Sequence, residues 1–173
     1  MRLRVARDDD DAFRRLFYSL SDTTRYLYFC AGVPANESWA ERFVALGHSD
    51  GFRSYVLVAE VEEAGESIVI GFTRFSQRPD ASHHEHLADM GIVLTDAWQG
   101  RGLGGPMLAR LAAEARRREI TTLTAEVLWG NRRMLRLAAR TFPEMRATYA
   151  SGSCSLTIDL EAWCVAPDVR RCG

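Results

Sequence analysis

The stretch ADMGIVLTDAWQGRGLGGPMLARLAAEARRRE, residues 88–119, contains three different patterns in direct succession. It begins with a short apolar run over 88–94, which is typical of a β-strand. A turn rich in glycine follows over 99–105, and apolar residues then recur at helical spacing. Pro106 is compatible with the start of that helix, because N–H groups of a first turn have no partner inside the helix. The apolar face that we expect this helix to bury consists of Leu103, Met107, Leu108, Leu111 and Ala115.

The glycine-rich turn predicts a binding site for a diphosphate. Backbone N–H groups at the start of a helix point outward without partners, and the helix dipole adds partial positive charge there. Gly100, Gly102, Gly104 and Gly105 lack a Cβ atom, so an anion can come close to the main chain. The spacing is not the GxGxxG of dinucleotide-binding folds, and a P-loop is excluded because the chain contains no lysine.

The segments on either side of this stretch predict a mixed α/β fold around a central sheet. Strands are rich in β-branched and aromatic residues, whereas helices show the 3.6-residue apolar period. In chain order, the other elements that we expect are a short strand near residue 3, a helix after Asp8–Asp11, two helices within 22–47, a hairpin of strands 54–61 and 67–75, a loop over 77–85, a strand over 121–128, a helix capped by Asn131, and two closing strands in RATYA and SCSLTIDL.

Composition limits the classes of function. The 22 basic residues, all arginine, balance 23 acidic residues and leave a net charge of -1, which disfavours binding to nucleic acid. No apolar run has the roughly 20 residues of a membrane span, and the first residues lack the apolar core of a secretion signal. We therefore expect a cytoplasmic protein with free cysteines, no membrane association and one domain over residues 1–173, with a short tail from about 162.

Several segments resemble the GNAT acetyltransferase superfamily. Residues Gln99 to Gly104 match its [Q/R]xxGx[G/A] signature, which in that family grips the pyrophosphate of acetyl-CoA. The stretches 88–104 and 125–142 resemble the acetyltransferase domain of Pat-like protein lysine acetyltransferases, and so does SLSDTTRYLYFCAGVP (19–34). The resemblance implies the GNAT fold, in which a twisted, mostly antiparallel sheet is splayed between its fourth and fifth strands and carries helices on both faces.

The resemblance also implies how acetyl-CoA, the expected cosubstrate, would be held. The pantetheine arm would lie along the backbone of Ile92, Val93 and Leu94. Asn131 would contact the pantetheine or orient the neighbouring strand, and helix capping alone would also explain this residue. The expected pyrophosphate site comprises Gln99, Gly100, Arg101, Gly102, Leu103, Gly104 and Gly105.

Acetyl transfer to a primary amine requires a neutral amine, because the protonated form cannot attack a thioester. Two carboxylates are candidates for the base. Asp89 stands where Pat-like enzymes carry a glutamate, and its shorter side chain favours action through a water molecule. Glu126 stands where ribosomal-protein alanine acetyltransferases have their base, and an anchoring role would also explain it. Ala138 occupies the position where many relatives carry a tyrosine that protonates the leaving thiolate, so we expect departure without that acid.

The sequence leaves the acceptor open. A protein lysine is the favoured acceptor, a small-molecule amine is the main alternative, and a module that binds acyl-CoA without turnover is a third possibility. The chain could also form a homodimer. His83, His84, Glu85 and His86 lie close together in the sequence, but we expect a solvated loop and no metal, because adjacent ligands on one loop rarely converge on an ion.

Overall fold

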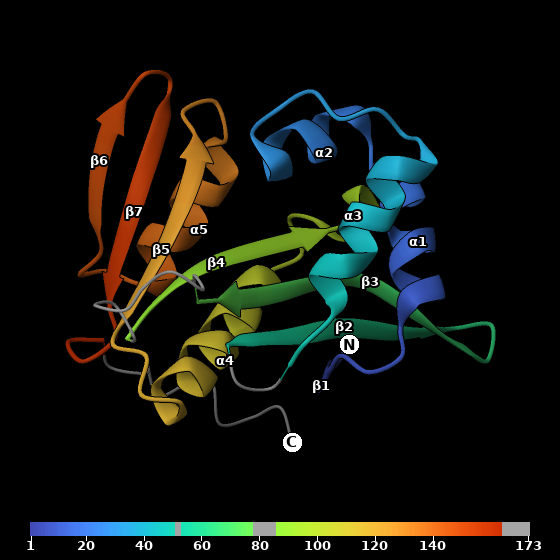
Figure 1. The fold of residues 1–173 in the computed structure, drawn as a ribbon, viewed down its shortest axis with the longest axis horizontal. Helices are drawn as coiled ribbons and strands as arrows, with labels where there is room; N and C mark the ends of the chain where they lie inside the picture. The colour runs from blue at the N-terminus through green and yellow to red at the C-terminus, as the bar shows by residue number, and fades with distance from the viewer. Residues whose placement is uncertain (51–52, 78–85, 164–173) are drawn as a thin grey trace.

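The computed structural model describes residues 1–50, 53–77 and 86–163 (Figure 1). These residues form a mixed α/β fold with a single sheet, which confirms the expected fold class. In chain order the elements are β1 (Arg2–Val5), α1 (Asp10–Ser19), α2 (Asp22–Phe29), α3 (Glu37–Gly47), β2 (Ser54–Glu63), β3 (Glu66–Ser76), β4 (Leu87–Leu94), the 3-10 turn η1 (Asp96–Trp98), α4 (Gly104–Arg117), β5 (Thr122–Leu128), α5 (Arg132–Thr141), β6 (Arg146–Ala150) and β7 (Ser153–Asp159).

The sheet is antiparallel except at its centre. Its strand order is β1-β2-β3-β4-β5-β7-β6, and only β4 and β5 run parallel. These two strands pair over three residues each, from Leu87 opposite Thr122 to Asp89 opposite Thr124. Beyond that point β4 follows β3 as far as Leu94, while β5 follows β7 as far as Leu128. The two strands therefore diverge, as Figure 1 shows, and the expected splay is confirmed.

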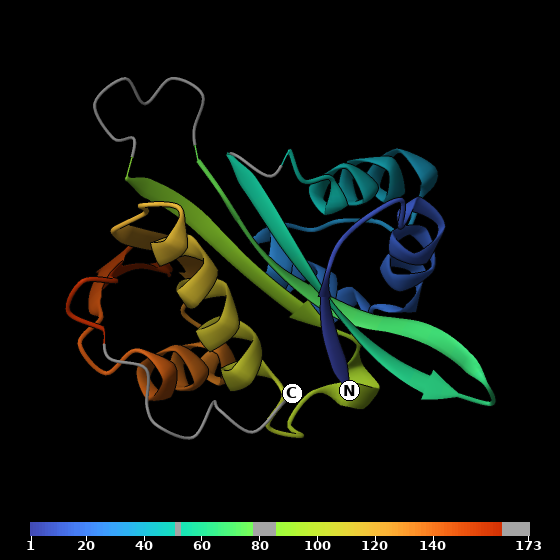
Figure 2. The ribbon, with the colours of Figure 1, turned by 90° about the horizontal axis from the view of Figure 1, so that it is seen from below.

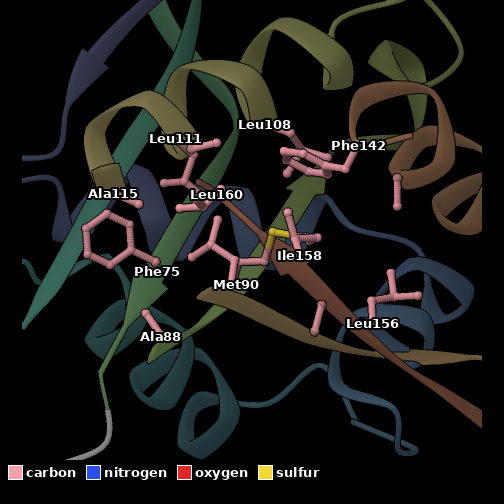
Figure 3. Close-up of a cluster of buried hydrophobic side chains, with 14 of the residues drawn as sticks. Phe75, Ala88, Met90, Leu108, Leu111, Ala115, Phe142, Leu156, Ile158 and Leu160 are labelled. Atoms are coloured by element: carbon pink, nitrogen blue, oxygen red, sulfur yellow. The ribbon is translucent and has the colours of Figure 1, made fainter. Parts of the chain in front are cut away.

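Helices cover both faces of the sheet (Figure 2). α4 and α5 lie on one face, where they bury the largest apolar cluster against β3, β4, β5 and β7. Figure 3 shows part of this cluster, in which Leu108 and Leu111 of α4 meet Phe75, Met90 and Ile158 of the sheet. The alternation of side chains along a strand places every second residue of these strands on this face. Burial of this continuous apolar surface fixes the register of the sheet.

The opposite face is covered by α1 and α3, with α2 beside them. Phe13 and Phe43 of these helices pack against Phe72 of β3, and Phe17 packs against Phe43, in an aromatic cluster with ring centroids 4.9–6.1 Å apart. α2 extends further and contacts both β4 and β5, so it lies across the opening between the diverging strands (Figure 1). We call this side of the sheet the α2 face.

The elements expected from the sequence are present in the described residues, with boundaries within a few positions. The expected loop over 77–85 lies outside the described residues, apart from Gln77. Cys30 and Cys154 are free thiols, while Cys164 and Cys172 are not among the described residues. No helix in the described part of the chain is long and apolar enough to span a membrane.

Candidate functional site

A groove with a volume of about 2020 Å³ begins where β4 and β5 separate. Pockets for one small ligand usually measure about 300–1,000 Å³, so this groove has room for a long ligand and a second molecule. It is lined by most of the residues that the sequence predicted. Of these predicted residues, the lining includes Ile92, Val93, Leu94, Gln99, Gly100, Gly102, Leu103, Gly104, Gly105, Glu126 and Asn131. Arg101 and Asp89 are not part of it.

The glycine turn, residues 99–105, has the conformation that an anion site requires. Gly100 and Gly102 have φ of +74° and +79°, a region that favours glycine, and the space where a Cβ would stand is empty at both. In the described part of the chain, no hydrogen bond is recorded from the backbone N–H groups of residues 100–105. These groups therefore remain available to a ligand at the start of α4.

A close approach of α4 to α5 at Gly104 sets the position of α4. A Cβ on Gly104 would stand 2.7 Å from Leu137 Cδ2, a distance at which the neighbour has to shift. The absent side chain thus lets the start of α4 pack directly on α5. Asn131 sets the start of α5 itself, because its Oδ1 accepts a hydrogen bond from the N–H of Met134 at 3.1 Å. The capping role expected for Asn131 is present, and the residue also lines the groove.

Within residues 1–50, 53–77 and 86–163, the edge of β4 that faces the groove has no strand partner beyond Asp89. The N–H of Thr95 bonds to Ile70 O of β3 at 2.8 Å. Successive N–H groups of a strand point to opposite edges, so the N–H of Leu94 points toward the opening. The carbonyl of Leu94 accepts a hydrogen bond from Gln99 Nε2 at 2.9 Å. Among the described residues, the main-chain groups of Ile92 and the N–H of Leu94 are therefore left without a strand partner on the edge that faces the groove.

The side chains of Gln99 and Arg101 make contacts within and around the glycine turn that the signature does not predict. The amide of Gln99 also donates to Thr24 Oγ1 at 3.1 Å and accepts from Arg133 Nη1 at 3.4 Å. The side chain of Gln99 thus links the glycine turn to α2 and α5 by hydrogen bonds. The guanidinium of Arg101 stacks over the ring of Trp98, with 4.6 Å from Cζ to the ring centroid, and stays outside the groove.

Sequence reasoning missed a polar link between α2 and the glycine turn. Asp96 Oδ1 accepts hydrogen bonds from Ser21 Oγ at 2.7 Å and Thr24 Oγ1 at 2.9 Å, and Oδ2 accepts from the N–H of Ser21 at 3.1 Å. Burial alone would raise the pKa of Asp96, but these hydrogen bonds outweigh it and hold the pKa below its usual value. Ser21, the N-cap of α2, is recognisable in the sequence as a capping residue. Its partner 75 residues away is not.

Both predicted carboxylates lie on the α2 face. Leu123, Ala125 and Val127 of β5 are buried under α4, so the alternating positions, including Glu126, face the other way. The same alternation along β4, where Ala88 and Met90 are buried under α4, places Asp89 on the α2 face. Asp89 stands at the last paired position before the strands diverge, and Thr124 Oγ1 of β5 donates a hydrogen bond to Asp89 Oδ1.

Glu126 lies further along β5 and is anchored to β7. One carboxylate oxygen accepts a hydrogen bond from Ser153 Oγ, and the other accepts from Ser155 Oγ at 2.5 Å. The hydrogen bonds from Ser153 and then Ser155 lower the pKa of Glu126, which makes this carboxylate a weaker base. The anchoring role that the sequence left open is thus present, and the exposed side chain also reaches the groove.

The last turn of α2 supplies two further polar groups at the opening. The hydroxyl of Tyr28 lies over Gly91 of β4, 3.3 Å from the point where a Cβ of that glycine would stand. Cys30 ends the helix, with its Sγ 3.7 Å from the carbonyl oxygen of Glu126. Burial raises the pKa of the Cys30 thiol, with a further contribution from Glu126, so this cysteine has little thiolate character at neutral pH.

Neither Ala138 nor His86 lines the groove. Ala138, at the position where the resemblance implies a tyrosine acid in many relatives, is fully buried in the cluster under α4. His83, His84 and Glu85 lie outside the described residues, while the exposed His86 forms a 2.7 Å contact between Nδ1 and the carbonyl of Glu119. In the part of the chain that the structure describes, no group of three or more histidine, cysteine or acidic side chains could hold a metal ion.

Comparison with known proteins agrees with this geometry. The family model for the acetyltransferase (GNAT) domain matches residues 1–141, and the chain therefore belongs to the GNAT acetyltransferase family. It is an N-acetyltransferase that uses acetyl-CoA as cosubstrate. Among curated proteins, the comparison finds none that matches.

Among solved structures, the chain is similar to the GNAT domain of S. lividans PAT. The two share 25% identity with a TM-score of 0.77, over 91% of this chain and 89% of that one. A putative acetyltransferase from Salmonella typhimurium, yncA, solved with its cofactor acetyl-CoA, shares the fold at 22% identity and a TM-score of 0.64, over 96% and 97% of the chains. A ribosomal-protein-alanine N-acetyltransferase from Brucella melitensis shares it at 20% identity and 0.66, over 91% and 98%.

Proposed function

We propose that the protein transfers the acetyl group of acetyl-CoA to the side-chain amine of a protein lysine. The observation that carries the proposal is the groove, which is larger than one small ligand needs and joins the glycine turn to the opening under α2. The resemblance of residues 19–34, 88–104 and 125–142 to Pat-like enzymes supports a lysine acceptor. The similarity to the GNAT domain of S. lividans PAT supports the same subgroup.

Acetyl-CoA would lie along the bank of the groove formed by β4 and the glycine turn. The pyrophosphate would accept hydrogen bonds from the unpaired N–H groups of residues 100–105, where the dipole of α4 favours negative charge. The pantetheine arm would pair with the free edge of β4 from Ile92 to Leu94. This arrangement directs the thioester toward the point where β4 and β5 separate, next to the α2 face.

The transfer needs a neutral amine and a stabilised oxyanion. The amine nitrogen attacks the thioester carbonyl carbon, the N–C bond forms, the C–S bond breaks and the electron pair leaves with the thiolate. The N–H of Leu94, which points into the opening, would stabilise negative charge on the thioester oxygen. The proton that the amine loses would pass to Asp89 through a water molecule, and the thiolate would leave without a tyrosine acid because Ala138 cannot supply one.

Asp89 is the proposed base because it stands at the point of divergence and its carboxylate is held by Thr124. Glu126 remains the alternative, since it reaches the groove directly, although its lowered pKa and its two serine partners favour an anchoring role. Arg101 is the one predicted cosubstrate residue that we assign to packing within the turn.

A direct test is incubation with acetyl-CoA and a panel of lysine peptides, whole proteins and small amines, with release of free thiol and product mass as readouts. Acetyl-lysine formed on a protein acceptor would support the proposal, and acetylation of small amines alone would support the alternative acceptor class. Because this chain contains no lysine, any acetyl-lysine detected belongs to the acceptor. Binding of acetyl-CoA without thiol release for any amine would favour the role of a non-catalytic sensor.

A further inference from the structure

Arg74 of β3 lies on the α2 face, and no hydrogen-bond or salt-bridge partner for it exists among the residues that the structure describes. Phe72 of β3 and Val56 of β2 are buried on the α2 face. Arg74 is two residues from Phe72 along β3 and pairs with Val56 across the β2–β3 ladder, so its side chain lies on the same face. The Nε atom of Arg74 is buried, and it makes no hydrogen bond in the described part of the chain. No salt bridge of this half-buried guanidinium is recorded there either. Buried cationic groups are normally paired, so this arrangement is unusual for a purely structural side chain.

Gly91 and Tyr28 are neighbours of Arg74 on the α2 face. Gly91 is the partner of Arg74 across the β3–β4 ladder, and the ring of Tyr28 occupies the place where a side chain of this glycine would stand. The hydroxyl of Tyr28 stands over the same glycine, and no hydrogen bond of this hydroxyl is recorded within residues 1–50, 53–77 and 86–163. Tyr28 and Gly91 both line the groove. Two donors, the guanidinium of Arg74 and the hydroxyl of Tyr28, thus belong to residues that both neighbour Gly91, although Arg74 itself is not among the residues that line the groove.

The same position lies beside the proposed base. Asp89 is two residues from Gly91 on the same strand face and is diagonal to Arg74, because Asp89 pairs with Ser76. Diagonal neighbours in a sheet have Cα atoms about 7–8 Å apart. Long side chains span this separation, so an amine near Asp89 would bring a neighbouring group of the same acceptor within reach of Arg74. The positive charge also acts on Tyr28, whose pKa is raised by burial and lowered in part by Arg74.

We propose that Arg74, assisted by the hydroxyl of Tyr28, binds a carboxylate of the acceptor that lies close to the reacting amine. The proposal rests on the proposed acetyl transfer and names a feature of its acceptor. A guanidinium binds carboxylates through two parallel hydrogen bonds, which would orient the amine toward the thioester. Two sources have this chemistry: an acidic residue next to the target lysine of a protein, and the α-carboxylate of a free amino acid.

The test compares matched acceptor pairs that differ in the carboxylate alone. The first set pairs peptides in which the lysine is flanked by aspartate with the same peptides carrying asparagine. The second set pairs free amino acids with the amines formed by their decarboxylation. Acetyl transfer is followed by thiol release, and kcat/KM is determined for each member with the wild type, Arg74→Met, Arg74→Lys and Tyr28→Phe.

In at least one set, we expect the wild type to prefer the carboxylate member by about tenfold or more, since hydrogen bonds to charged groups are among the stronger ones. Arg74→Met should remove this preference through a higher KM for the carboxylate member, while the plain amine stays within about twofold. Arg74→Lys should retain part of the preference and Tyr28→Phe most of it. The set that shows the preference identifies whether the carboxylate belongs to a peptide or to an amino acid.

Acetyl-CoA affinity and the thermal unfolding midpoint serve as controls, since both should match the wild type in each variant. Equal kcat/KM within every pair for the wild type would overturn the proposal, and so would an equal loss for both members in Arg74→Met. If no amine is acetylated at all, the proposed function fails separately. In that case, calorimetry measures binding of the same acidic peptides and amino acids to the CoA-bound protein. Binding that is lost in Arg74→Met supports the carboxylate site, and no binding that depends on Arg74 overturns it.

Discussion

The two banks of the groove are built from different parts of the chain. In the described part of the chain, the bank formed by β4 and the glycine turn offers main-chain groups: the free edge from Ile92 to Leu94 and the unpaired N–H groups of residues 100–105. The α2 face offers side chains that come from four separate elements, among them Asp89, Arg74, Tyr28 and Glu126. A main-chain site tolerates changes of side chain but not of backbone conformation, whereas a side-chain site has the opposite sensitivity.

The largest effect is expected from the backbone of the glycine turn. Gly102→Val places a β-branched residue at φ +79° and adds bulk where a ligand would approach the main chain. We expect the affinity for acetyl-CoA to fall by about 100-fold or more, measured by calorimetry. The matched control is Gly65→Val in the β2–β3 turn, which has φ +85° and an equally empty surrounding. Intact affinity in Gly102→Val, or an equal loss in Gly65→Val, would show that the turn is not the anion site.

On the α2 face, a substitution of the proposed base should lower turnover and leave the affinity for acetyl-CoA unchanged. Asp89→Asn retains the size of the side chain but removes the base, so kcat should fall by about 100-fold while acetyl-CoA affinity stays nearly unchanged. Glu126→Gln is the comparison variant and should reduce kcat by less than about fivefold, because its carboxylate is anchored by Ser153 and Ser155. A larger loss in Glu126→Gln than in Asp89→Asn would transfer the role of base to Glu126.

Variants of Asn131 test whether a side chain on the bank formed by β4 and the glycine turn contributes to acetyl-CoA binding as well as to stability. Its Oδ1 is engaged in capping α5, so Asn131→Ala should lower the free energy of unfolding by ~1 kcal/mol. Asn131→Asp, which can cap equally well, should restore that stability in urea denaturation. If affinity for acetyl-CoA falls tenfold in a variant whose stability is restored, the residue contacts the cosubstrate as well.

Asp96 joins the two banks, and the smallest effect is expected there. Its hydrogen bonds with Ser21 and Thr24 favour the ionised carboxylate, so the folded-state pKa lies below the ordinary value of 3.8. The stabilisation is therefore complete above that value and is lost as the pH falls through the lowered pKa. Asp96→Asn should cost about 0.5–1 kcal/mol at neutral pH, with a difference that shrinks toward about pH 3. A difference that is independent of pH would mean that the charge is not involved.

The same contrast explains how much the sequence could predict. The strand, the glycine turn and α4 are consecutive in the chain, so local patterns are sufficient to predict a ligand site at Gly102. The α2 face depends on register between distant segments. Thr124 binds a carboxylate 35 residues away, and the link from Asp96 to Ser21 spans 75 residues. No local pattern reveals that Gly91, Arg74 and Tyr28 meet, because strand pairing and helix packing bring them together.

The central claim is that the N–H groups of residues 100–105 hold the pyrophosphate of acetyl-CoA beside the free edge of β4. A crystal structure of the complex with acetyl-CoA tests it most directly. The account predicts the pyrophosphate oxygens within hydrogen-bond distance of those N–H groups, with the pantetheine paired along Ile92–Leu94. A pyrophosphate bound elsewhere, or N–H groups of this turn that make no contact with it, would contradict the account.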